Sequence, residues 1–297
     1  MIEKKSAKSL GKKRVSVIVL VSLLVISLLF GIFTIYDNFR VDIKTYTFSS
    51  KEIPQSLSGY KIAHISDYHN RKSKMINDSV LESLRAESPD IIVFTGDAVD
   101  SENPDFKQSL SFMKALQDIA QVYFVTGNHE HRLSASHTKD YNTFISDIEN
   151  IGVEILTGST VEISGNDGES IYLHGIMDPY FTECEPYEID KATDDLCSEL
   201  TLNEGYNILI AHHPEQMDVY ERYGFDLVLA GHAHGGQVTI FGKPIKAPDQ
   251  SGIPRYSQGL YEEGNTKMVI SRGIGYSVAP IRVFCSSQLV YIELKSQ

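Results

Sequence analysis

An apolar, uncharged stretch occupies residues 15–36 and follows a basic arm, residues 1–14. As an α-helix, at about 1.5 Å per residue, the stretch is roughly 33 Å long, which is enough to cross the hydrocarbon core of a bilayer. Basic flanks stay on the cytoplasmic side. We therefore predict a single-pass transmembrane helix with its N-terminus in the cytoplasm and residues 37–297 outside the cell membrane.

Two other structures give a similar pattern: a cleaved signal peptide and the buried core helix of a soluble domain. The apolar run is long for a signal peptide, and no small-residue cleavage site follows Tyr36. These features favour the membrane anchor, and whether the segment is cleaved stays open.

From Val41 onward, short apolar runs rich in β-branched residues alternate with polar, turn-forming clusters. Five runs end abruptly at Asp, His or Asn: KIAHISDYHN, DIIVFTGDAVD, QVYFVTGNHE, NILIAHHPE and DLVLAGHAHGG. Such runs predict buried strands. Residues 75–87 and 106–120 have helical spacing between the first three, which predicts an α/β domain with partly parallel strands. The loops at the carboxyl ends of parallel strands meet at one edge, where such sheets bind ligands.

One Gly-Asp or Gly-Asn pair is usually only a turn, but five polar clusters at strand ends predict a shared site. The side chains available there are Asp67, His69, Asp97, Asn128, His129, His212 or His213, His232 and His234. Imidazole and carboxylate ligands without thiolates suit Mn, Zn, Fe or Co, and there are more donors than one ion needs. We predict two divalent metal ions, the arrangement used for in-line displacement at phosphorus.

His232 and His234 stand one residue apart, as do Asp67 and His69. In an extended segment, residues two apart point to the same side, so each pair is expected to face the ions together. The glycines around the histidine pair allow the backbone to turn close to the metals.

The five clusters, read in order as Asp-x-His, Gly-Asp-x-x-Asp, Gly-Asn-His-Glu, His-x-Pro and Gly-His-x-His, resemble the calcineurin-like metallophosphoesterases. The resemblance extends over about residues 41–294. The stretches HGGQV, APDQSGIPRYSQGLY and SRGIGYS are similar to membrane-associated or exported bacterial members. The resemblance implies a four-layer α-β-β-α sandwich of two mixed sheets in residues 37–297.

Residue by residue, the resemblance implies the following ligands for the two metals: Asp67, His69, Asp97 and His234 for one, and Asp97, Asn128, His212 and His232 for the other. It also implies that His129 is a non-ligand histidine that stabilises charge or protonates the leaving oxygen. Either histidine of AHHP can reach a metal; the family pattern favours His212, which leaves His213 at the rim.

Three residues at or beside the clusters carry secondary expectations. Tyr68 replaces the aliphatic residue expected between Asp67 and His69, and a core position is expected for it. His131 is a further candidate for substrate contact, and Asp100 is expected to brace its loop.

Cys184 and Cys197 are the nearer pair among three cysteines, and whether they form a disulfide stays open.

The chain has a net charge of -12, which becomes -17 without the basic arm. Such a surface repels nucleic acid, so we expect no nucleic-acid partner. We predict an enzyme that hydrolyses phosphate mono- or diesters of a phosphorylated small molecule or lipid. A short tether between Tyr36 and Val41 motivates phospholipid or lipid-linked envelope substrates. The alternative is a metal-binding sensor without turnover; a zinc peptidase is disfavoured because HEHRL has no second zinc-binding histidine.

Overall fold

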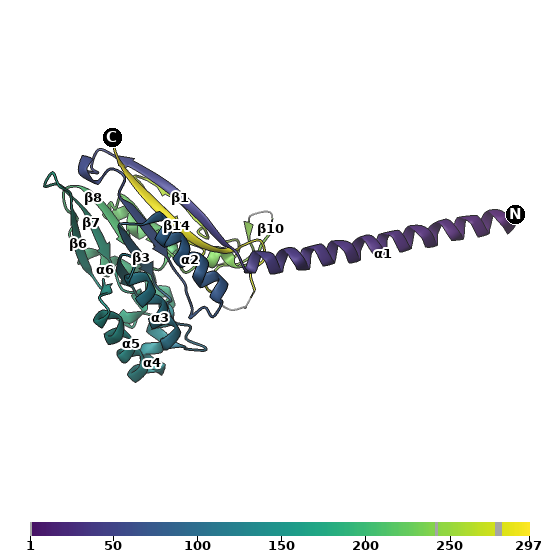
Figure 1. The fold of residues 1–297 in the computed structure, drawn as a ribbon, viewed down its shortest axis with the longest axis horizontal. Helices are drawn as coiled ribbons and strands as arrows, with labels where there is room; N and C mark the ends of the chain where they lie inside the picture. The colour runs from purple at the N-terminus through teal and green to yellow at the C-terminus, as the bar shows by residue number, and fades with distance from the viewer. Residues whose placement is uncertain (1, 241–242, 277–280) are drawn as a thin grey trace.

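The computed structural model describes residues 2–240, 243–276 and 281–297, with side chains from Ser16 onward apart from Ile240 (Figure 1). Ser277, the last residue of the SRGIGYS stretch, lies outside the described residues. The α-helices are α1 (Ile2–Asn38), α2 (Lys74–Glu87), α3 (Phe106–Gln117), α4 (Asn128–Ser136), α5 (Thr138–Asn150), α6 (Ile189–Ser198) and α7 (Met217–Tyr223). Short 3-10 helices occur at Gln55–Leu57, Pro179–Thr182, Pro186–Glu188, Pro214–Gln216 and His234–Gly236.

Two six-stranded sheets form the centre of the domain. The first has the order β1 (Val41–Ser50), β14 (Ser287–Ser296), β2 (Lys61–Ile65), β3 (Ile91–Thr95), β4 (Gln121–Val125) and β5 (Glu154–Ile155). The second has the order β12 (Gly259–Glu263), β13 (Thr266–Ile270), β9 (Leu227–Ala230), β8 (Tyr206–Ile210), β7 (Ser170–Gly175) and β6 (Ser159–Ser164). A small hairpin joins β10 (Thr239–Ile240) to β11 (Lys243–Pro244). Both large sheets contain parallel and antiparallel neighbours, as predicted.

Three apolar clusters fill the space between four layers, which are two sheets and a layer of helices on the outer face of each. Val93 and Ile292 of the first sheet pack with Ile208 and Leu229 of the second, which places the two sheets face to face. A second cluster joins the outer face of the first sheet to α2, α3 and α5, and a third joins the second sheet to α6 and α7. Burying each such aliphatic side chain contributes roughly 1.5–3 kcal/mol. The α-β-β-α sandwich implied by the resemblance is therefore confirmed.

The helix α1 leaves the domain at the edge of the first sheet where β2, β3 and β4 end. These three strands are parallel, and β14 is antiparallel to β2. Because β1 runs parallel to β14, β1 begins at the edge where β2 ends, directly after α1. Figure 1 shows α1 projecting from this end, beside β10, with the C-terminus at the opposite end.

The apolar part of α1, Ser16–Asn38, is long and apolar enough to cross a membrane by its length and composition. Its side chains are largely exposed, which is not the environment of a core helix. The helix is longer than the predicted 15–36, because it begins at Ile2 and ends at Asn38. Its last turn is fixed to the domain: Asn38 Nδ2 donates to the Arg282 carbonyl (2.6 Å), and the Cys285 N–H donates to Asp37 Oδ2 (3.0 Å).

Cys184, Cys197 and Cys285 are free thiols, so the disulfide left open by the sequence is not formed in this structure. Cys184 donates instead to the Pro179 carbonyl at 3.5 Å.

Tyr68 is fully buried, as expected from its position between two polar residues. Its ring stacks on Phe112 with a centroid distance of 4.1 Å. Its hydroxyl donates to the Arg71 carbonyl (2.9 Å) and accepts from Asn77 Nδ2 (3.0 Å) and Gln108 Nε2 (2.7 Å). Tyr68 therefore ties the loop after β2 to α2 and α3.

We expect Tyr68→Phe to lower the free energy of unfolding by about 1–2 kcal/mol, because the amide groups around the hydroxyl lose a buried partner. Thermal unfolding measured by circular dichroism checks this. Tyr187→Phe is the matched control, since that side chain is 83% exposed. Equal unfolding temperatures for the two variants would contradict the role assigned to Tyr68.

Candidate metal centre

The backbone of the metal-binding loops adopts left-handed conformations at five candidate ligands. The φ angles are 50° at Asp67, 46° at His69, 57° at Asp97, 65° at His232 and 50° at His234. Our expectation of extended Asp-x-His and His-x-His segments is therefore wrong. Tight turns aim these side chains, and each non-glycine residue in this region costs about 1 kcal/mol or more, a strain that clusters at functional sites.

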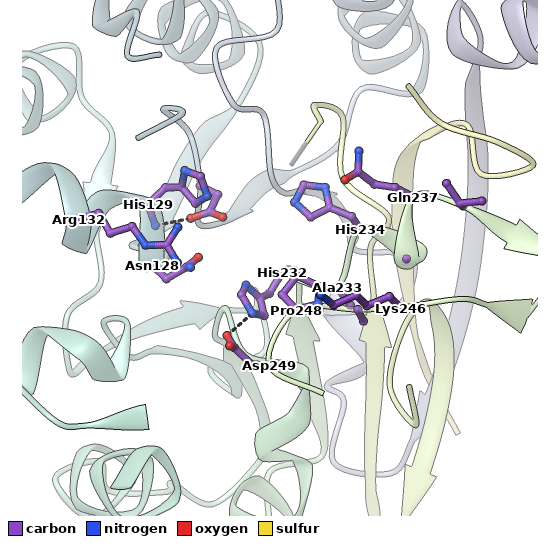
Figure 2. A pocket seen from close by; sticks show the side chains of 14 residues that line it. Asn128, His129, Arg132, His232, Ala233, His234, Gln237, Lys246, Pro248 and Asp249 are labelled. Atoms are coloured by element: carbon purple, nitrogen blue, oxygen red, sulfur yellow. Dashed lines mark hydrogen bonds and ion pairs between the residues drawn. The ribbon is translucent and has the colours of Figure 1, made fainter. Parts of the chain in front are cut away.

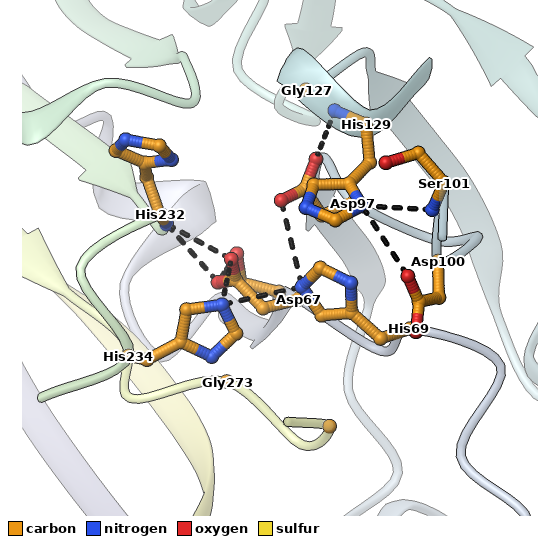
Figure 3. Close-up of polar contacts among 12 residues, drawn as sticks. Asp67, His69, Asp97, Asp100, Ser101, Gly127, His129, His232, His234 and Gly273 are labelled. Atoms are coloured by element: carbon orange, nitrogen blue, oxygen red, sulfur yellow. Dashed lines mark hydrogen bonds and ion pairs between the residues drawn. The ribbon is translucent and has the colours of Figure 1, made fainter. Parts of the chain in front are cut away.

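Four side chains form the first group of candidate ligands (Figure 3). His69 Nε2 lies 3.5 Å from Asp97 Oδ2 and 3.2 Å from His234 Nε2. His234 Nε2 in turn lies 3.3 Å from Asp67 Oδ1. All four side chains are buried, and their ligand atoms all lie within 4.8 Å of one another.

The second group shares Asp97 with the first. His212 Nε2 lies 3.3 Å from Asp97 Oδ2 and 3.1 Å from His232 Nδ1. The Asn128 side-chain amide lies 3.2 Å from the same Asp97 oxygen, and with its nitrogen toward the carboxylate it donates to Asp97 Oδ2 while its oxygen accepts from Arg132 Nη2 at 3.1 Å. The structure thus brings together the residues that the sequence predicted as ligands.

Hydrogen bonds outside the two groups determine which ring nitrogens have a free lone pair. His212 Nδ1 donates to the Thr95 carbonyl at 2.7 Å, so its Nε2 is unprotonated in the neutral ring. His232 Nε2 bonds Asp249 Oδ2 at 2.8 Å, which leaves its Nδ1 for a metal. Such partners orient metal-binding imidazoles and raise their basicity. The donor set therefore fits two divalent cations held by nitrogen and oxygen.

His213 has no nitrogen left for a metal. Its Nδ1 bonds Glu215 Oε1 (2.6 Å) and its Nε2 bonds Asp178 Oδ2 (2.8 Å). Burial by itself lowers the pKa of His213, but the two carboxylates raise it well above its ordinary value. The ring is fully buried, so the expected rim position is wrong, and the geometry favours His212 as the ligand.

The electrostatics of the centre depend on Asp97. Burial by itself raises the pKa of the Asp97 carboxyl, but His212 and His129 hold it well below its ordinary value. Burial by itself lowers the pKa of His212, but the negative charge of Asp97 outweighs this effect and raises the pKa of His212 to about 10. For His69, burial lowers the pKa to about 3. A proton and a divalent cation thus compete for the place beside Asp97.

Glu130 fixes the loop that carries Asp97. Its carboxylate accepts from the backbone N–H groups of Asp97 (2.8 Å) and Val99 (3.2 Å). Asp100 braces this loop as expected: its N–H donates to Asn70 Oδ1 (2.7 Å), and its carboxylate accepts from the Glu102 N–H (2.9 Å) and lies 3.8 Å from His129 Nδ1. Glu130 was not predicted as a site residue, although it is the last residue of the Gly-Asn-His-Glu cluster.

His129 lies beside the candidate ligands without a free Nδ1. That nitrogen accepts the Ser101 N–H at 2.9 Å, so the neutral ring carries its proton on Nε2. Burial lowers the pKa of His129, which favours the neutral ring. Its ring meets His69 edge to face at 4.5 Å. The neutral ring of His129 thus offers an N–H at Nε2, whereas its Nδ1 is already occupied.

A cavity of about 350 Å³ opens over the metal centre (Figure 2). Asn128, His129 and Arg132 line one side, and His232 and Lys246 lie across from them. Arg132 and Lys246 bring positive charge to the cavity wall. Neither was predicted from the sequence, because neither belongs to one of the five metal-ligand clusters.

Two other residues near the site have structural partners. His131 packs on Tyr180 and Phe181 at centroid distances of 6.0 and 5.3 Å, away from the cavity lining, so the expected substrate contact is not supported. Arg272 forms an ion pair with Asp42 of β1 at 2.6 Å.

Comparison with known proteins gives a consistent result. The family model of the calcineurin-like phosphoesterases matches residues 60–236. An uncharacterised metallophosphoesterase of Campylobacter jejuni is 28% identical over 93% of this chain and 69% of its own length. YkuE of Bacillus subtilis, also an uncharacterised metallophosphoesterase, is 27% identical over 86% of both chains.

Two further matches are more distant. A transmembrane protein with a metallophosphoesterase domain from Danio rerio is 27% identical over 82% of this chain and 55% of its own length. Among solved structures, TT1561 of Thermus thermophilus covers 73% of this chain and 92% of its own, with 11% identity and a TM-score of 0.47.

The two neighbouring histidines can be separated by experiment. We expect His212→Asn to lose about one metal equivalent, because a ligand is removed. We expect His213→Gln to keep both metals at saturating metal but to unfold at a lower temperature, since Asp178 and Glu215 lose their buried cation, a loss of about 3–5 kcal/mol. Elemental analysis and thermal unfolding measure the two effects. Equal metal loss in both variants would overturn the assignment of His212.

Proposed function

Because the chain belongs to the calcineurin-like phosphoesterase family and is a metal-dependent phosphoester hydrolase, we propose that it acts on phosphate esters of membrane lipids or lipid-linked compounds. The apolar helix α1 and the transmembrane relative from Danio rerio indicate a membrane protein. Because the basic arm precedes the apolar part of α1, we infer that the N-terminus lies in the cytoplasm and residues 37–297 outside it.

We assign the two metal sites to the two groups of converging side chains. Asp67, His69, Asp97 and His234 would hold one ion, and Asp97, Asn128, His212 and His232 the other. Two such ions, when bound, stabilise negative charge on the phosphoryl oxygens and activate water. Asp97 is common to both ligand groups, so its carboxylate would contact both ions. Asn128 supplies a neutral oxygen, which limits the negative charge that a phosphate ester meets.

His129 and Arg132 act on the substrate directly in this proposal. The Nε2–H of His129 donates to the leaving oxygen, and Ser101 holds the ring in that tautomer. Arg132 lines the same cavity from α4 and binds a phosphoryl oxygen. A protein that only senses metal has no requirement for a proton donor at this place, so His129 favours turnover over the sensor alternative.

The position of the cavity relative to α1 carries the proposal for a lipid substrate. The metal-binding loops follow β2, β3 and β4 at the edge where α1 joins β1. Arg282 connects the two: its N–H donates to Asn38 Oδ1 (2.8 Å), and its Nη1 donates to the His234 carbonyl (3.3 Å). Only residues 39–40 separate α1 from β1. If α1 crosses the bilayer, the cavity therefore lies close to the phosphate groups at the bilayer surface.

We expect Asp97→Asn to lose bound metal and activity together, because the shared carboxylate is removed. His129→Ala should retain metal and lose about 10²–10⁴-fold in kcat, the usual contribution of a general acid. Elemental analysis and hydrolysis of an aryl phosphate ester with Mn measure both quantities. Retention of two metals by Asp97→Asn would refute the bridging role.

Removing the membrane helix tests the lipid substrate. We expect residues 37–297 alone to hydrolyse soluble aryl phosphate mono- and diesters as the full chain does. The same shortened chain should hydrolyse phospholipids in vesicles about tenfold or more slowly than the full chain reconstituted in the same vesicles, since tethering raises the effective concentration. If the full chain turns over soluble and lipid esters with equal kcat/KM, the lipid substrate is wrong, whereas phosphoester hydrolysis stands.

A further inference from the structure

We propose that a second pocket, at the junction between α1 and the domain, binds the phosphate group of an anionic membrane lipid. This junction pocket has a volume of about 370 Å³ and is lined by Phe39, Arg71, Lys72, Ser73 and Tyr276, among others. No residue of its described lining belongs to the cavity over the metal centre. The proposal does not depend on hydrolysis.

Arg71 is the residue that points to an anion. Its side chain lies 3.7 Å from the Tyr276 ring centroid, and Nη2 donates to the Asn38 carbonyl at 3.2 Å. The residue is only 6% exposed, and its Nε has no hydrogen-bond partner. No carboxylate forms an ion pair with it in the part of the chain that the structure describes. A buried, unpaired guanidinium is costly, and a phosphate would supply the missing charge and acceptors.

The remaining walls of the junction pocket add positive potential. Ser73 caps the N-terminus of α2, a helix of 14 residues with no acidic residue in its first turn. The positive end of a helix dipole favours anions. Lys72 lies beside Arg71 and is paired only at the surface, with Asp105 Oδ2 at 3.3 Å. The lining thus contains two cationic side chains and no acidic one among the described residues.

The place of the junction pocket favours a lipid over a soluble anion. Phe39 follows the last residue of α1 and lies half exposed at the pocket wall. If α1 crosses the bilayer, Phe39 at its end lies at the level of the head groups, where aromatic side chains are enriched. A phospholipid phosphate occupies that same depth. Its acyl chains would then run along the exposed apolar surface of α1.

A lipid in the junction pocket would also hold the metal centre at the membrane. Arg71 lies two residues after the candidate ligand His69, on the loop between β2 and α2. The intervening Asn70 accepts the Asp100 N–H at 2.7 Å and so joins this loop to the one that carries Asp97. The phosphate would therefore bridge the end of α1 to the loop of the first metal group.

Native mass spectrometry of the full chain with bound metal, in an uncharged detergent, tests the proposal. The probes are phosphatidylglycerol and a diacylglycerol with the same acyl chains. We expect the wild type to retain phosphatidylglycerol and Arg71→Gln to retain about tenfold less, because a charge-assisted hydrogen bond is lost. Lys72→Gln should show a smaller loss, and Lys139→Gln, an exposed site with the same charge change, should match the wild type.

The controls separate the sources of the signal. The mass of each bound lipid shows whether it has been hydrolysed, so a failure of catalysis does not obscure binding. Displacement by inorganic phosphate would identify the free anion as a sufficient ligand, and its failure would identify the intact lipid; both support the pocket. Metal content and unfolding temperature are measured for each variant. If Arg71→Gln does not fold, Lys72→Gln decides, since that side chain is 72% exposed. The proposal is overturned if the Arg71 and Lys72 variants retain as much phosphatidylglycerol as the wild type does. It is also overturned if the wild type retains diacylglycerol as well as phosphatidylglycerol.

Discussion

The architecture of this protein depends on one buried carboxylate, that of Asp97, with unshared lone pairs converging around it. His69 and His212 reach the same Asp97 oxygen from two different sheets, at 3.5 and 3.3 Å. The other Asp97 oxygen accepts the His129 N–H at 2.9 Å. A buried cluster of acceptors is unfavourable unless protons or cations fill it. Two divalent ions satisfy all of these groups, which explains why the polypeptide brings five distant loops to one place.

The fold tolerates the strain of these loops because the layers around them are well packed. Left-handed residues at the strand ends cost free energy, and the burial of the apolar clusters on both sides of each sheet offsets this cost. Space is equally limited: a Cβ atom added at Gly127 would lie 2.3 Å from Asp97 Oδ1. The ligand loops are therefore rigid elements of the core edge rather than free surface loops.

Topology also explains why the membrane helix and the chemistry share one end of the molecule. A strand that follows α1 and runs antiparallel to β2 must begin where β2 ends. The buried Arg282 uses this proximity, because its backbone and side chain bond Asn38 at the end of α1 and His234 in the centre. The cavity over the metals and the junction pocket consequently lie on the side of the domain that α1 joins. The end of α1 and the candidate metal ligands are thus joined through one buried arginine.

The sequence by itself determined the chemistry of the site. Ligand types are a local property of short motifs, so Asp67, His69, Asp97, Asn128, His129, His232 and His234 could be identified from residue type and position at strand ends. The number and order of the sheets came from the resemblance, because periodicity does not encode which strands pair.

Only the tertiary structure decided the features that arise from contacts between distant segments. Asp178 and Glu215 exclude His213 as a ligand, whereas Thr95 orients His212. Left-handed turns replace the expected extended pairs, since packing against neighbouring loops overrides local preference. Arg132 and Arg71 acquire their significance from the cavities around them. A lone arginine in a sequence carries no such information, because burial and the absence of a counter-ion exist only after the chain has folded.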